Sequence, residues 1–121
     1  MTQTLDMIFG IGTDIVEIER IKKAIDRWGE DFLKHILTDE EIAGAKRYQQ
    51  PFAHYAGRFA AKEAIFKAMR DPQFSWHDVT ITNDRQGRPM CQYHRRNFKK
   101  HILISISHSK AYATAFCIVT S

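Results

Sequence analysis

The sequence predicts an α+β fold in which an antiparallel sheet packs against one long central helix. Hydrophobic residues alternate with a period of two near both ends of the chain, and they recur every three to four residues through its middle. One expected strand comes before the helices and four follow them, an order typical of α+β folds. No repeat, low-complexity tract or linker divides the 121 residues, so we expect a single domain over residues 1–121.

The composition limits the classes of function. With 44% hydrophobic and 26% charged residues, the chain is typical of a globular protein. No apolar run approaches the roughly 20 residues that span a bilayer, so we expect no membrane association. The net charge of +4 predicts an anionic partner, which can be a nucleic acid, a phosphorylated small molecule or an acidic protein.

The location and the cysteine chemistry follow from two further features. The N-terminus lacks the basic head and apolar core of a secretion signal, which predicts a cytoplasmic protein. Cys91 and Cys117 are the two cysteines, and they have no metal-ligand spacing. We expect both to be small residues of the core or of a sheet edge.

The first expected strand covers residues 7–16. Its alternation turns Phe9, Ile11, Thr13 and Ile15 to one face and Gly10, Gly12 and Asp14 to the other. Two glycines on one face leave an open floor, which usually marks the close approach of a ligand or of another backbone. Asp14 stands at the end of that floor, where it either serves a ligand site or caps the next helix.

The next segment, residues 17–28, has the pattern of an amphipathic helix that ends at Gly29. Its outer side carries a basic row made of Arg20, Lys23 and Arg27. Such a row is a solvated face by default, and the functional alternative is contact with the acidic surface of a partner.

Two shorter helices follow. An apolar segment at residues 32–37 precedes Thr38 and Glu41, which have the spacing of a capping box. The helix that this box opens is expected to run to about residue 48 and to end before Pro51.

The central helix is expected over residues 52–69. One arc of it carries small residues, which lets another element approach the helix backbone closely; these are Ala53, Gly57, Ala60, Ala61, Ala64 and Ala68. Glu63 lies beside a second, aromatic arc, one turn before Lys67. Glu63 therefore either forms a simple surface pair with Lys67 or serves a site that needs a carboxylate.

From residue 75 onward the period changes to two. Strands are expected around residues 79–81 and 88–93, joined by a turn with Gly87 at positive φ. A basic connection at residues 94–100 leads to a closing hairpin with strands at 102–107 and 111–119 and with His108 in its turn.

Three parts of the chain could form one site: Asp14, the helical pair Glu63 and Lys67, and His108. Two carboxylates from separate elements suit Mg²⁺, which usually takes one or two of them and completes its shell with water and phosphate oxygens. The histidine and cysteine spacing does not fit zinc. Ser107 and His108 are not a hydrolase pair, because adjacent strand residues point to opposite faces.

Several segments together resemble a known family. They are GTDIVEIER at residues 12–20, GRFAAKEA at 57–64 with Lys67 and Ala68, GRP at 87–89, and ISISHSK at 104–110. In this order and spacing the chain is similar to the bacterial holo-acyl-carrier-protein synthases, the short class of 4′-phosphopantetheinyl transferases. The resemblance covers residues 7–119. It departs at residues 69–76, which lack the usual Gly-rich loop, so it assigns no coenzyme contacts to that region.

The resemblance implies a Mg²⁺-dependent reaction for fatty acid biosynthesis. The phosphopantetheine arm of coenzyme A passes to a serine of apo-acyl carrier protein, and adenosine 3′,5′-bisphosphate is the other product. By resemblance, Asp14 and Glu63 match the Mg²⁺ ligands and Lys67 matches a catalytic lysine at the pyrophosphate. The attacking serine needs a base, and Glu63, acting through a water molecule on the metal, is the preferred candidate.

The remaining contacts are also implied by the resemblance. The residues expected to bind coenzyme A, besides Lys67, are Arg58, Lys62, Asn83, Gly87, Pro89, Ser107 and His108. Arg20 is expected to face the acidic carrier protein, with Lys23 and Arg27 extending its basic row. Members of the family are trimers with active sites between subunits, so a homotrimer is expected. Residues 1–6 precede the usual start and are expected to be a disordered extension or to precede an alternative start of translation at Met7.

Two alternatives remain open from the residues alone. One is a basic nucleic-acid-binding module that uses Arg95, Arg96, Lys99 and Lys100 on phosphates. Such a module has no need for Asp14 and Glu63, which would repel the ligand, so we expect no nucleic-acid partner. The other is a relative that modifies a different carrier, such as a domain of a polyketide or fatty-acid synthase.

Overall fold

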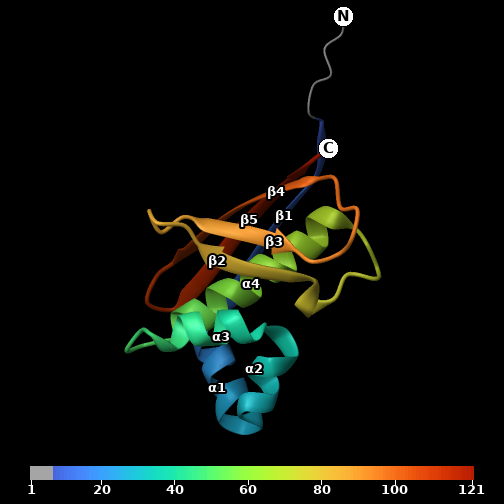
Figure 1. The fold of residues 1–121 in the computed structure, drawn as a ribbon. Coiled ribbons are helices and arrows are strands. Elements are labelled where there is room, and N and C mark those ends of the chain that lie inside the picture. The colour runs from blue at the N-terminus through green and yellow to red at the C-terminus, as the bar shows by residue number, and fades with distance from the viewer. Residues whose placement is uncertain (1–6) are drawn as a thin grey trace, which may run out of the picture.

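A computed structural model describes residues 7–121 (Figure 1). The expected extension at residues 1–6 lies outside the described residues. The helices are α1 (Ile18–Trp28), α2 (Glu30–Ile36), α3 (Asp39–Lys46) and α4 (Phe52–Met69), with a short 3₁₀ turn η1 (Trp76–Asp78). The strands are β1 (Ile8–Glu17), β2 (Val79–Asn83), β3 (Pro89–Tyr93), β4 (His101–His108) and β5 (Tyr112–Thr120).

The strands form two antiparallel sheets. β1, β5 and β4 make a three-stranded sheet in that order, whereas β2 and β3 pair only with each other. The first strand and the closing hairpin, which lie at opposite ends of the chain, therefore meet in one sheet, with Asp14 opposite Ala115. The expected α+β class is confirmed, and the structure adds that its strands are divided between two sheets.

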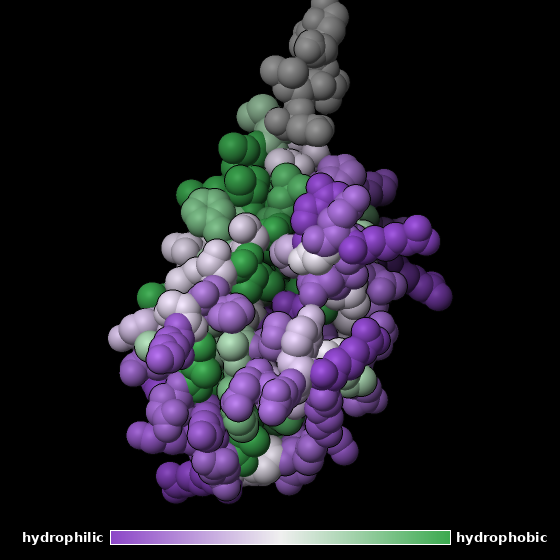
Figure 2. Space-filling model, turned by 90° about the vertical axis from the view of Figure 1, so that its left-hand side faces the viewer, coloured by the Kyte–Doolittle hydropathy of each residue, from purple (hydrophilic) through white to green (hydrophobic). Residues whose placement is uncertain are grey.

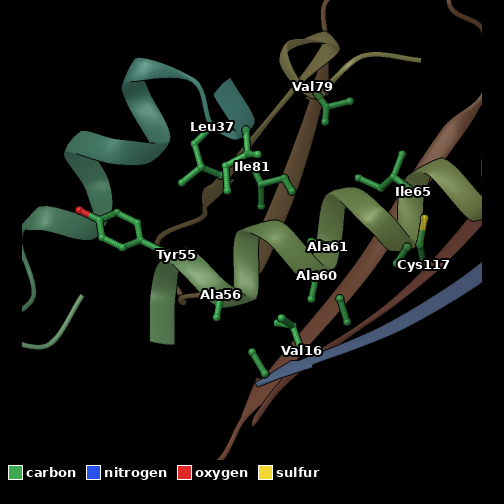
Figure 3. Close-up of a cluster of buried hydrophobic side chains, with 14 of the residues drawn as sticks. Val16, Leu37, Tyr55, Ala56, Ala60, Ala61, Ile65, Val79, Ile81 and Cys117 are labelled. Atoms are coloured by element: carbon green, nitrogen blue, oxygen red, sulfur yellow. The ribbon is translucent and has the colours of Figure 1, made fainter. Parts of the chain in front are cut away.

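Helix α4 lies between the two sheets and contributes more buried residues to the core than any other element. Leu37, Val79 and Ile81 pack on one side of it and Val16 on the other (Figure 3). The small-residue arc behaves as expected, since Ala60, Ala61, Ala64 and Ala68 are fully buried. Small side chains let the helix backbone approach the strands, and the larger side chains fill the space around it.

The local signals of the sequence correspond to real boundaries. Gly29 ends α1 with φ of 68°, and Gly87 has φ of 84° in the β2–β3 turn. Thr38 and Glu41 form the expected capping box, in which each side chain accepts a hydrogen bond from the other residue's N–H. The third helix is shorter than expected, since it ends at Lys46 rather than near residue 48.

Burial assigns the cysteines to the core region. Cys117 is fully buried and Cys91 is half-buried. Burial raises the pKa of each thiol to about 12, which keeps both protonated at neutral pH.

No helix within residues 7–121 is both long and apolar enough to cross a bilayer.

Candidate active site

The carboxylates of Asp14 and Glu63 line one pocket. Asp14 comes from the second half of β1 and Glu63 from the middle of α4, so two distant segments supply them. The pocket has a volume of about 340 Å³, and Arg20 and Phe59 also line it. The structure thus brings together two of the sequence-predicted site residues and one residue of the basic row.

Two glycines allow this approach. A Cβ atom at Gly10 would overlap the carbonyl oxygen of Ala68, and one at Gly12 would overlap that of Ala64. Any side chain at these positions would push β1 away from α4. The open floor expected from the sequence is therefore filled by the backbone of the central helix, which places Asp14 beside Glu63.

Lys67, on α4, links this helix to β1 next to Asp14. Its Nζ donates a hydrogen bond to the carbonyl oxygen of Thr13 at 2.9 Å and lies 3.3 Å from Asp14 Oδ1. Among the residues that the structure describes, no ion pair links Lys67 to Glu63, so the simple surface pair considered from the sequence does not form. The Lys67 side chain is half-exposed, and its positive charge acts on the carboxylates of both Asp14 and Glu63.

The electrostatics of Glu63 reflect its surroundings. Burial raises the pKa of Glu63 above its ordinary value, the negative charge of Asp14 raises this pKa further, and Lys67 opposes the shift. Two carboxylates that repel each other in a half-buried pocket are suited to a cation. Across residues 7–121 no three His, Cys, Asp or Glu side chains gather as a metal cage, but Mg²⁺ usually needs only one or two protein carboxylates.

A second pocket, which we call the α3–α4–β2 pocket, lies between those three elements. Arg58 and Asn83 face each other there, with Arg58 Nη2 3.2 Å from Asn83 Oδ1. Tyr48 and His54 also line it, and their rings stack with centroids 3.6 Å apart. The pocket combines a cation, an amide and stacked rings, which together suit a phosphorylated nucleotide.

His108 lies next to the α3–α4–β2 pocket, because it contacts His54, which lines that pocket. Its ring meets that of His54 edge-on, with centroids 5.9 Å apart. Burial lowers the pKa of His54, and the positive charges of Arg58 and His108 lower it further. A neutral His54 at physiological pH leaves the guanidinium groups of Arg58 and Arg47 as the positive charges that line the pocket.

Three other residues predicted to contact the coenzyme, Gly87, Pro89 and Ser107, lie on two separate hairpins. Pro89 pairs with Asn83 across the β2–β3 hairpin, and Gly87 forms its exposed turn. Asp84 holds that turn in shape by accepting hydrogen bonds from the N–H groups of Gln86 and Arg88. Ser107 lies opposite Thr114 on the outer face of the three-stranded sheet, and this face is turned away from His54.

Lys62 is not a coenzyme contact in this structure, which corrects the prediction for that residue. Its side chain is fully buried, and its Nζ lies 2.6 Å from Glu41 Oε1. It also donates to the carbonyl oxygens of Trp76 at 2.6 Å and Val79 at 3.1 Å. Three acceptors surround the ammonium group, so none of its hydrogens is free for a ligand.

The three residues of the basic row have different surroundings along α1. Arg20 and Lys23 are exposed on α1, and Arg20 lines the pocket of Asp14 and Glu63. Arg27 stacks over the ring of Trp28, with its guanidinium carbon 4.9 Å from the ring centroid. The row therefore runs along α1 from the carboxylate pocket to the end of the helix.

Sequence reasoning missed three residues around these pockets. Tyr48 and His54 were not assigned to a site, although His54 stands one helical turn before Arg58 and so shares its face of α4. Glu41 was recognised only as part of the capping box, and its pairing with Lys62 depends on a contact that no local pattern reveals.

Comparison with known proteins defines the class. Residues 10–117 match the model of the 4′-phosphopantetheinyl transferase superfamily. The chain belongs to this superfamily.

Its relatives within the superfamily are holo-[acyl-carrier-protein] synthases. The synthase of Thermodesulfovibrio yellowstonii is 42% identical over 115 residues, which cover 94% of this chain and 100% of the relative. That of Chlorobaculum tepidum is also 42% identical, over 89% of this chain and 95% of the relative.

Solved structures agree with this assignment. The Bacillus anthracis synthase in complex with CoA (3′,5′-ADP) has a TM-score of 0.84 and 38% identity, covering 95% of this chain and 98% of its own. The Helicobacter pylori synthase in complex with coenzyme A has a TM-score of 0.81 and 32% identity, covering 90% of this chain and 98% of its own. The predicted family and fold are therefore confirmed.

Proposed function

We propose that this chain transfers the 4′-phosphopantetheine group of coenzyme A to a serine of apo-acyl carrier protein, in a reaction that requires Mg²⁺. The observation that carries the proposal is the pocket shared by Asp14 and Glu63, with Lys67 bound to Asp14 at its edge. The similar synthases of B. anthracis and H. pylori were both solved as complexes with the coenzyme, which supports coenzyme A as the substrate.

Asp14 and Glu63 are the residues that would hold Mg²⁺. Their carboxylates come from separate elements, share one pocket, and repel each other enough to contribute to the raised pKa of Glu63. When bound, Mg²⁺ supplies positive charge to the phosphate oxygens. Lys67 lies on the same side and contributes a second positive charge toward the pyrophosphate.

The reaction is a phosphoryl transfer, in which positioning and charge do most of the work. The bond from the serine oxygen to the phosphorus of the pantetheine phosphate forms while the bond to the departing adenosine 3′,5′-bisphosphate breaks. The serine proton passes to a base, for which Glu63 is the candidate. Lys67 balances the negative charge that develops on the departing phosphate.

The α3–α4–β2 pocket is proposed to bind the nucleotide end of coenzyme A. Arg58 and His108 provide positive or hydrogen-bonding groups, and Asn83 provides an amide that can select the base or sugar. Gly87 and Pro89, on the adjoining hairpin, stay candidates for contacts to the same end of the molecule.

One copy of the chain does not place all these groups around one ligand. At about 100° per residue, Glu63 is turned by about 140° and Lys67 by about 180° from Arg58 around α4. The two pockets therefore lie on different sides of the helix. A neighbouring copy that supplies the nucleotide pocket would complete the site, which supports the expected homotrimer with active sites between subunits.

The outer face of the three-stranded sheet is the surface proposed for this association. It carries exposed apolar side chains on all three strands, among them Ile11, Ile15, Leu103 and Phe116, exposed by 61%, 63%, 58% and 47%. Figure 2 shows hydrophobic side chains gathered over the upper part of one side of the molecule. Apolar patches of this kind usually mark a protein interface.

The acidic carrier protein is proposed to bind along α1, whose basic row of Arg20, Lys23 and Arg27 begins at the carboxylate pocket. This position lets one partner reach both the row and the reacting phosphate. The cytoplasmic location, the role in fatty acid biosynthesis and the choice among carrier proteins stay predictions.

The nucleic-acid alternative is less well supported by the structure. Arg95, one of its four expected phosphate contacts, instead forms ion pairs with Asp71 at 3.0 Å and Asp78 at 3.1 Å. Its guanidinium group therefore holds the segment after α4 against η1.

Mass spectrometry of purified apo-acyl carrier protein, incubated with the protein, coenzyme A and Mg²⁺, tests the proposed reaction. A mass gain of one phosphopantetheine is expected, and it should be lost with EDTA and with Asp14→Asn. An unmodified carrier, or full activity of Asp14→Asn, would contradict the reaction or the metal site respectively.

A further inference from the structure

A buried ion pair that the proposed reaction does not use stands behind the α3–α4–β2 pocket. Lys62 Nζ lies 2.6 Å from Glu41 Oε1, and both side chains are fully buried. Burial lowers the pKa of Lys62, whereas the Glu41 carboxylate acts in the opposite direction. Charged groups are costly to bury, so their retention in a core calls for a physical reason.

The pair connects three elements through directional hydrogen bonds. Glu41 Oε1 accepts from the N–H of Thr38 at 2.8 Å, at the start of α3. Glu41 Oε2 accepts from the N–H of Ile81 at 2.7 Å, in β2. Lys62, in the middle of α4, donates to the carbonyl oxygens of Trp76 and Val79 at the entrance to β2.

The same three elements form the walls of the pocket. Glu41 and Ile81 are themselves among the lining residues. Arg58 lies one helical turn before Lys62, on the same face of α4, and Asn83 follows Ile81 by two residues. The contact between Arg58 and Asn83 at 3.2 Å therefore depends on how β2 is placed along α4.

Strand β2 has few other restraints on this placement. It pairs with β3 alone and does not join the three-stranded sheet. Two of its three buried side chains, Val79 and Ile81, are apolar, and apolar contacts tolerate sliding better than hydrogen bonds do. The third, Thr80, adds one hydrogen bond of 3.3 Å to the Thr38 hydroxyl at the start of α3. The bonds from Lys62 and Glu41 to the backbone of β2 are its backbone hydrogen bonds to both α4 and α3, and they fix its position along the central helix.

Stability alone does not account for the pair. Replacing a buried ion pair by apolar residues of similar volume is often neutral or even stabilising, because both charges must be desolvated. A fixed geometry between two elements is a use for which a charged, hydrogen-bonded pair is better suited than an apolar contact.

We propose that Glu41 and Lys62 are positioning residues that hold Asn83 opposite Arg58 and thereby set the affinity for the nucleotide end of coenzyme A. This inference rests on the proposed function for the identity of the ligand. The placement of β2 by the pair does not depend on that identity and can be measured without a ligand.

The test compares wild type with Lys62→Met and with the charge-neutral double variant Glu41→Gln/Lys62→Met, which leaves no lone buried charge. Calorimetric binding of adenosine 3′,5′-bisphosphate should weaken about tenfold in both variants, which is about 1.4 kcal/mol. The kcat at saturating coenzyme A should stay within about twofold, because Asp14, Glu63 and Lys67 are unchanged. Hydrogen exchange at the Ile81 and Asn83 amides of the free protein should become faster.

Two control variants separate positioning from general effects. Lys46 is on α3, like Glu41, and Lys46→Met breaks its exposed ion pair with Glu30 of α2. This variant should leave nucleotide binding unchanged. Ile65→Val creates a small void elsewhere in the core on α4 and should lower the melting temperature without weakening nucleotide binding.

Three results would overturn the proposal. Unchanged nucleotide affinity with a lower melting temperature would make the pair a purely structural element. A fall in kcat at saturating coenzyme A with unchanged affinity would place Lys62 in the chemistry. Unchanged exchange at Ile81 and Asn83 in both variants would also refute it, whatever the wild type binds. A wild type that binds neither nucleotide nor coenzyme A would instead refute the proposed function.

Discussion

The absent side chain of Gly12 faces the carbonyl oxygen of Ala64, and a Cβ atom at this position would overlap that oxygen. Gly12 lies two residues before Asp14 on β1, and Ala64 directly follows Glu63 on α4. The close approach of these two backbones therefore sets the separation of the two carboxylates. The site depends on a glycine that takes no part in the chemistry.

Gly12→Ala should destabilise the fold and damage the site. The added methyl group forces β1 away from α4, which costs about 1–3 kcal/mol, as overpacking of a core does. We expect a lower free energy of unfolding by urea titration and a weaker response of activity to Mg²⁺.

Gly44→Ala is the matched control. A methyl group at this position would meet no atom within 4 Å, and the residue is inside α3. The substitution should stabilise the protein by about 0.4–1 kcal/mol, because alanine is the better helix former. Equal losses in the two variants would contradict the close-approach explanation.

Glu63→Gln should abolish transfer while stabilising the free protein. Loss of a metal-binding carboxylate is expected to cost at least about a hundredfold in kcat/KM, since even residues behind metal ligands can cost 10–100-fold. At neutral pH the variant should have a higher melting temperature without Mg²⁺, because a half-buried charge next to Asp14 has been removed. Retained transfer would remove Glu63 from the site.

The raised pKa of Glu63 also predicts how stability varies with pH. Between the ordinary pKa and the raised native value, the folded state binds more protons at this residue than the unfolded state does. The contribution of Glu63 to stability is thus fully present below the unfolded pKa and is lost as pH rises through the folded pKa. Glu63→Gln should lack this decline, so in metal-free buffer the difference in unfolding free energy between wild type and variant should change with pH over this interval.

Arg20→Glu should weaken the carrier protein selectively. Arg20 lines the pocket of the two carboxylates and is exposed, so its charge can meet an acidic partner. The KM for carrier protein should rise about tenfold or more, about 1.4 kcal/mol, with a much smaller change for coenzyme A.

Arg96→Glu provides the control for net charge. This residue is exposed in the basic connection between β3 and β4, away from α1. Neither KM should change appreciably. Comparable effects of the two charge reversals would mean that overall charge, rather than the row on α1, attracts the carrier.

Leu103→Glu should prevent self-association and lower transfer by about tenfold or more. Leu103 is 58% exposed on the outer sheet face, and an unpaired charge there is costly to bury in an interface. Sedimentation velocity should show smaller particles than for wild type. Met90→Glu, with a similarly exposed side chain on β3, should sediment as wild type does. A Leu103→Glu variant that keeps its size and activity would contradict the proposed interface.

Local patterns accounted for most of the secondary structure. Alternation defined β1 and the closing hairpin, the Thr38–Glu41 box opened α3, and Gly29 ended α1, because these signals act within a few residues. The division of five strands into two sheets was not predictable in this way, since pairing of β1 with β5 joins the two ends of the chain.

The site shows the same division between local and long-range information. The types of residue at Asp14, Glu63 and Lys67, together with the glycines of β1, indicated a carboxylate site as one of two interpretations, and the family resemblance selected it. Whether Lys67 pairs with Glu63 or with Asp14 was decided by the packing of β1 on α4. Lys62 shows most clearly what the sequence alone does not reveal. Its motif suggests a ligand contact, but in the structure the side chain is buried in the core. There it pairs with Glu41 and donates to two backbone carbonyl oxygens, in β2 and directly before it. Burial and pairing over long sequence separations are properties of the folded chain, because they depend on which surfaces are removed from water together.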